Sequence, residues 1–77
     1  MLKSNFAENL KRLRQAKGIG QVELAKQIGV SKGIISLWEN GLREPTLSSL
    51  IVLADFFGVG LDELVGIEYI KEDDLIV

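Results

Sequence analysis

The 77-residue sequence contains no cysteine and no histidine, and only one proline and one tryptophan. Without cysteine no disulfide can form, and a zinc or haem site would lack its usual sulfur and nitrogen ligands. The first residues contain no apolar stretch of signal-peptide length, and no apolar run is long enough for a membrane helix. We therefore expect no metal, no other cofactor, no membrane association and a cytoplasmic location.

The usual combinations of catalytic residues are also missing. Acid–base or nucleophilic catalysis needs a nucleophile beside a base, a pair of carboxylates or a metal. The serines have no histidine to serve as their base, and Asp73 and Asp74 lie near the end of the chain, where no pocket is expected. We predict that the protein is not an enzyme and has no catalytic residues.

The net charge of −2 is divided unevenly along the chain. Residues 1–45 carry eight Lys and Arg against four Glu, whereas residues 46–77 carry one Lys against seven Asp and Glu. This division allows a basic surface that attracts phosphate and an acidic end elsewhere, although ordinary scatter on a small surface would give the same counts.

Glycines cut the chain into segments of helical length. Apolar residues recur at helical spacing in five of these segments, residues 5–17, 21–28, 32–40, 47–57 and 61–65. A chain of this length has room for one core only. We predict a compact all-α domain of five helices over residues 1–66, followed by a C-terminal tail, residues 67–77.

The most informative pattern lies in residues 21–45. A helix of about eight residues, a short turn that begins with glycine and a second helix form a helix-turn-helix. Gly29 supplies the turn, and Ser31 is a good cap for the helix that follows. Ile35 and Trp38 occupy inward positions of that second helix, so we expect Trp38 in the core and not as a platform for base stacking.

Residues 10–66 resemble the XRE family, the Cro and phage-repressor type of helix-turn-helix. The motifs Q-x-E-L-A, G-V-S, W-E-N-G, R-E-P and L-D-E-L carry the resemblance and fall in register. The resemblance implies a repressor-like five-helix fold and a sequence-specific transcriptional regulator of double-stranded DNA, more often a repressor. It also implies a homodimer that binds a palindromic operator through the major groove.

The resemblance further implies roles for individual residues. Arg14 and Glu39 would form a partly buried ion pair between the first and third helices. Gln21 would contact a phosphate and brace side chains of the recognition helix. The implied DNA contacts are Gln21, Ser31, Lys32, Gly33, Ile34, Ser36, Leu37, Asn40 and Arg43, with Lys11, Arg12 and Lys17 adding attraction to the backbone.

The recognition helix carries few hydrogen-bonding groups on its DNA-facing side. Relatives often have polar residues where Gly33 and Ile34 stand, and Lys or Arg at Leu37. Ile34 and Leu37 could contact thymine methyl groups, while Gly33 allows a close approach to the groove. Alternatively, this face binds a protein, as in an antitoxin-like or antirepressor subunit. We favour DNA, because isolated exposed apolar residues are common on any surface.

Apolar residues near the fourth and fifth helices predict a subunit contact. The family forms dimers through this region, so that two recognition helices meet major grooves about 34 Å apart. The predicted dimer contacts are Ile51, Val52, Phe56 and Val59, and a place in the core is the alternative for Ile51, Phe56 and Val59. For the tail, a strand that pairs across the dimer, a cover over a core edge and a frayed end are comparable outcomes.

Overall fold

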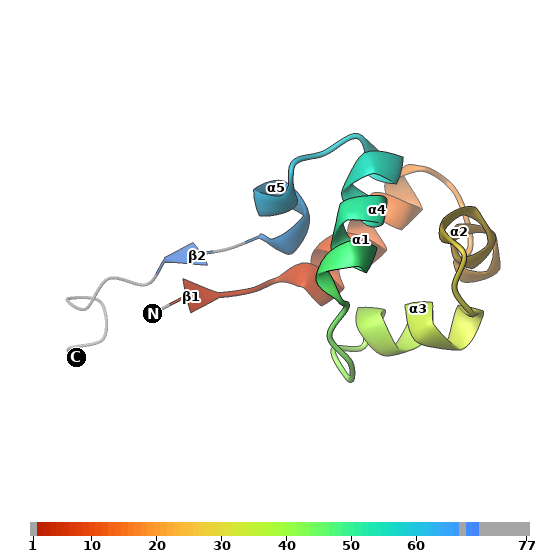
Figure 1. Ribbon diagram of the computed structural model, residues 1–77, viewed down its shortest axis with the longest axis horizontal. Helices are drawn as coiled ribbons and strands as arrows, with labels where there is room; N and C mark the ends of the chain where they lie inside the picture. Colours follow the sequence, from red (N-terminus) through yellow and green to blue (C-terminus); the bar gives the residue numbers. More distant parts are fainter. Residues whose placement is uncertain (1, 67, 70–77) are drawn as a thin grey trace.

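The computed structural model describes residues 2–66 and 68–69 (Figure 1). These residues form the helices α1 (Phe6–Ala16), α2 (Gln21–Ile28), α3 (Lys32–Glu39), α4 (Leu47–Phe57) and α5 (Leu61–Val65), with the two-residue strands β1 (Leu2–Lys3) and β2 (Glu68–Tyr69). The predicted five-helix fold is confirmed, and every helix begins and ends within one residue of its expected position. None of the described helices has both the length and the apolar character needed to cross a membrane.

Local chemistry sets the ends of the central helices. Ser31 precedes α3 with an extended backbone, and its hydroxyl accepts a hydrogen bond from the backbone N–H of Ile34. Thr46 caps α4 in the same way by accepting from Ser49. Gly29 ends α2 with a φ of 77°, a left-handed conformation that favours glycine. The turn between α2 and α3 therefore spans only residues 29–31, the short connection that a helix-turn-helix requires.

The inward sides of all five helices form one apolar core. Each helix contributes one fully buried side chain: Leu10, Leu24, Ile35, Leu53 and Leu64. Trp38 is only 4% exposed, and its ring meets that of Phe6 edge-on at a centroid distance of 6.3 Å. The prediction that Ile35 and Trp38 face inward is therefore confirmed. These two side chains fix α3 to the rest of the domain.

The end of α1 is tied to the end of α4. Lys17 Nζ donates a hydrogen bond to the carbonyl oxygen of Phe56 at 3.1 Å, and it lies 4.2 Å from the centroid of the Phe56 ring. Carbonyls in the last turn of a helix lack a partner within the helix and favour a nearby cation. In this geometry the Lys17 ammonium group stabilises the end of α4, and the DNA contact expected of Lys17 stays a prediction.

Replacing Lys17 by alanine should lower the free energy of unfolding by about 1 kcal/mol, because the Phe56 carbonyl loses a charged donor and its ring loses a cation. Urea denaturation measures the change. Lys26→Ala is the matched control, since Lys26 is exposed on α2, and it should alter stability by less than about 0.5 kcal/mol. Equal effects of the two substitutions would show that the Lys17 contact adds no stability.

The two strands join the beginning of the chain to residues 68–69. They pair antiparallel, with Leu2 opposite Tyr69 and Lys3 opposite Glu68, at the end of the molecule away from α2 and α3 (Figure 1). A strand was one of the outcomes expected for the tail, but the pairing is within one chain and not across a dimer. Residues 67 and 70–77 of the predicted tail lie outside the described residues.

Candidate nucleic-acid interface

One side of α3 faces solvent, while the other packs against α1 and α2 (Figure 1). Because Ile35 and Trp38 are buried, helical geometry places a different set of residues on the opposite side. This set, which we name the outer face of α3, consists of Gly33, Ser36, Leu37 and Asn40. Gly33 and Asn40 are exposed, and Ser36 and Leu37 are half-buried. The outer face is therefore a narrow, uncharged surface that combines small, apolar and polar groups.

The other predicted contacts near α3 occupy its edges. Lys32 is exposed in the first turn, and Arg43 is exposed in the loop that follows the helix. Ser31 is exposed too, although its hydroxyl is engaged in capping. Ile34 is partly buried and packs against the core. Of the two apolar residues expected to reach thymine methyl groups, Leu37 is therefore the better placed.

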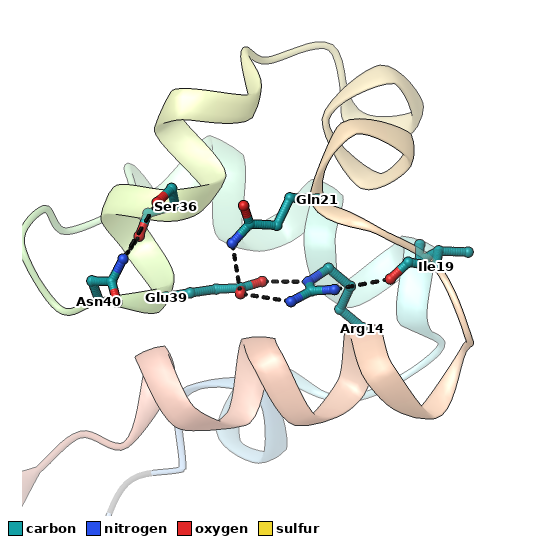
Figure 2. Close-up of polar contacts among 6 residues, drawn as sticks. All are labelled: Arg14, Ile19, Gln21, Ser36, Glu39 and Asn40. Atoms are coloured by element: carbon teal, nitrogen blue, oxygen red, sulfur yellow. Dashed lines mark hydrogen bonds and ion pairs between the residues drawn. The ribbon is translucent and has the colours of Figure 1, made fainter.

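The predicted ion pair between Arg14 and Glu39 is present (Figure 2). Arg14 Nε donates to Glu39 Oε2 at 2.6 Å, and Arg14 Nη2 donates to Glu39 Oε1 at 2.9 Å. A third bond runs from Arg14 Nη1 to the carbonyl oxygen of Ile19 at 2.9 Å. The Glu39 side chain is only 3% exposed and that of Arg14 only 11%, so the two-point pair is well shielded from water.

Gln21 joins this pair to α2. Its Nε2 donates to Glu39 Oε1 at 3.1 Å, so Glu39, near the end of α3, holds both α1 and α2 (Figure 2). Burial raises the pKa of Glu39, but the hydrogen bonds from Arg14 and Gln21 outweigh burial and leave it below its ordinary value of 4.5. The hydrogen bond to Glu39 likewise raises the pKa of Arg14. At neutral pH both groups are charged, and the network fixes the orientation of α3.

The cations predicted on α1 lie on different sides of the helix. Lys11 is exposed on α1, and its positive charge helps to lower the pKa of Glu39 at the end of α3. Arg12 Nη2 donates to Asn9 Oδ1 at 3.2 Å, and the Asn9 amide in turn meets backbone carbonyls of α5. Arg12 therefore lies on the α5 side and Lys17 at the end of α4. Neither belongs to the surface formed around α3.

The predicted dimer contacts divide into two kinds. Ile51 and Val52 are 52% and 45% exposed on α4. Phe56 and Val59 are partly buried and pack against the core, and the Phe56 ring also meets that of Phe57 edge-on at 5.1 Å. The alternative prediction, a place in the core, is therefore wrong for Ile51 and partly confirmed for Phe56 and Val59.

Comparison with known proteins identifies this arrangement. A family model described as helix-turn-helix matches residues 10–64. The transcriptional activator BcrR of Enterococcus faecalis is 44% identical over 59 residues, which cover 77% of this chain and 29% of BcrR. The chain thus spans less than a third of BcrR.

Two solved structures share the fold. A transcriptional regulator from Listeria innocua superimposes with a TM-score of 0.80 at 34% identity, covering 91% of this chain and 64% of that one. The P22 c2 repressor, solved in complex with a synthetic operator, superimposes with a TM-score of 0.74 at 32% identity, covering 78% of this chain and 91% of the repressor. The chain belongs to the XRE-type family of helix-turn-helix transcriptional regulators.

Proposed function

We propose that this chain binds specific DNA sequences by inserting the outer face of α3 into the major groove. The observation that carries the proposal is the way α3 is held. Ile35 and Trp38 anchor its inner side and Glu39 its end, while the outer face remains open to solvent. The major groove of B-form DNA is wide enough to admit an α-helix. The P22 c2 repressor, which has the same fold, was solved with a synthetic operator bound.

Cationic and helix-end groups surround the outer face. Gln21 and Lys32 are the first residues of α2 and α3, where free backbone N–H groups attract phosphate. Lys11 on α1 and Arg43 in the loop after α3 are exposed and add positive charge. These groups would hold the DNA backbone in a sequence-independent way, while the outer face selects the bases.

We further propose a homodimer that binds a palindromic operator. Ile51 and Val52 expose aliphatic surface on α4, and covering it with a second copy is favourable. Phe56 and Val59 would support that contact from the core. Two copies related by a two-fold axis would place their α3 helices about 34 Å apart. BcrR is named an activator and P22 c2 a repressor. For this chain we propose repression, by occupying the operator and excluding polymerase.

Selection of bound duplexes from a random DNA pool tests the proposal. The expected result is enrichment of one sequence arranged as an inverted repeat. An unenriched pool, together with a stable complex with another protein, would instead support a protein-interaction module of the antitoxin or antirepressor kind. The exposed apolar residues near α2 and α3, Val22 at 53% and Leu42 at 74%, are the observation that favours this second function.

Lys32→Ala should weaken binding to the selected operator by about 1–3 kcal/mol if the ammonium group reaches a base edge, with guanine as the preferred base. Competition between the selected duplex and a scrambled duplex measures the effect. An equal loss on both duplexes would assign Lys32 to a phosphate. Unchanged affinity for both would place Lys32 outside the interface.

A further inference from the structure

Gly33 leaves an unoccupied space at the N-terminal end of the outer face. Its φ is not positive, and a Cβ built there would meet only Ser31 Oγ, at an unstrained 3.8 Å. The fold therefore does not require glycine at this position, although glycine is a poor helix former. Leu37 lies one helical turn further on. Because Gly33 has no side chain, a partner can approach the backbone closely and reach the methyl groups of Leu37.

A hydrogen-bond donor, the Ser36 hydroxyl, lies beside Leu37 on the outer face. Asn40 Nδ2 donates to the carbonyl oxygen of Ser36 at 2.9 Å and to Ser36 Oγ at 3.3 Å (Figure 2). Since the Ser36 oxygen accepts from Asn40, its hydroxyl proton remains to be donated. Among the hydrogen bonds of the described residues, none has the Ser36 hydroxyl as its donor. Asn40 is therefore a positioning residue that leaves Ser36 as a donor next to Leu37.

A donor beside an apolar group matches one base edge in the major groove. Adenine and guanine present acceptors without a methyl group, and cytosine presents a donor, whereas thymine presents the O4 acceptor beside the C5 methyl group. We infer that the outer face of α3 reads one thymine in each half-site, with the Ser36 hydroxyl on O4 and Leu37 on the methyl group. This inference rests on the proposed function and adds to it the base that is recognised.

Replacing thymine by deoxyuridine removes the methyl group and keeps O4, so the full chain can be tested without any substitution. Each thymine of the selected operator is replaced in turn, and affinity is measured by fluorescence anisotropy. Replacement at one position in each half-site should weaken binding of the chain about fourfold, as expected for losing the burial of one methyl group. Replacement at the other thymines should change affinity less than twofold.

Three variants identify the contacts. Leu37→Ala should bind the thymine and uracil duplexes equally, because the partner of the methyl group is gone. Ser36→Ala should weaken binding to both duplexes and keep the fourfold ratio, because uracil retains O4. Leu47→Ala is the control, since Leu47 is 66% exposed on α4, and it should leave both affinities unchanged.

Each failure has a distinct meaning. If the chain selects and binds an operator but no uracil replacement weakens it, the inference is overturned and the proposed function stands. A fourfold ratio that persists in Leu37→Ala overturns the assignment to Leu37. Absence of any selected sequence overturns the proposed function itself.

Discussion

Replacing Glu39 by alanine should lower the free energy of unfolding by about 3 kcal/mol, a value typical of removing one partner of a buried ion pair. The Arg14 guanidinium, whose side chain is only 11% exposed, would keep its bond to the Ile19 carbonyl and lose both bonds to carboxylate oxygens. Gln21 would lose its acceptor at the same time. Urea denaturation followed by circular dichroism measures the change.

The control is Glu23→Ala, because Glu23 is exposed on α2 and accepts a hydrogen bond from Gln27 on the surface. This substitution should cost less than about 0.5 kcal/mol. If Glu39→Ala were equally mild, the network would not be holding α3 in place.

The same pair should make stability depend on pH. Because the folded-state pKa of Glu39 lies below its ordinary value of 4.5, the ionised group stabilises the fold fully above that pH. The stabilisation is lost as the pH falls through the folded-state pKa. The difference in unfolding free energy between wild type and Glu39→Gln should therefore be constant near neutral pH and shrink in acid. A difference that stays constant into acid would contradict the ion pair.

Affinity for the selected operator should fall about a thousandfold between 50 and 200 mM salt. Each subunit exposes Lys11, Lys32 and Arg43, so a homodimer would bring about six cationic side chains to the DNA and release about as many counterions. The expected slope of log affinity against log salt is about −5, measured by fluorescence anisotropy.

Arg43→Ala should make this slope shallower by about two, because a homodimer loses two phosphate contacts. Arg12→Ala is the control, since Arg12 lies on the α5 side of α1 and should leave the slope unchanged. A wild-type slope shallower than about −2 would contradict binding through these phosphate contacts.

The helices could be predicted because each of their ends is determined by residues nearby in the sequence. Gly29, Ser31 and Thr46 act on their own turn of backbone, and Ile35 and Trp38 show which side of α3 is buried. The ion pair between Arg14 and Glu39 could be predicted only through the family resemblance, because no spacing rule joins residues that are 25 positions apart.

The position of each cation around α1 could not be predicted from the residues of that helix alone. Lys17 and Arg12 both resemble solvent-facing cations in the sequence, and only the packing of α4 and α5 shows that they lie away from α3. β1 and β2 are two residues each, too short to show the alternation that identifies a strand. The bond between Asn40 and Ser36 could have been predicted, because residues four apart are neighbours on a helix.

The binding of Gly33→Glu to the selected operator tests most directly whether the outer face of α3 enters DNA. A side chain at Gly33 has room, and glutamate in the first turn of a helix is favourable, so the variant should melt at or above the wild-type temperature. Its carboxylate would face the DNA and should reduce affinity at least about a hundredfold, since a like charge facing the interface costs several kcal/mol. Ser48→Glu, which introduces the same side chain at the second position of α4, should bind normally. Wild-type affinity in a folded Gly33→Glu variant would contradict the proposal.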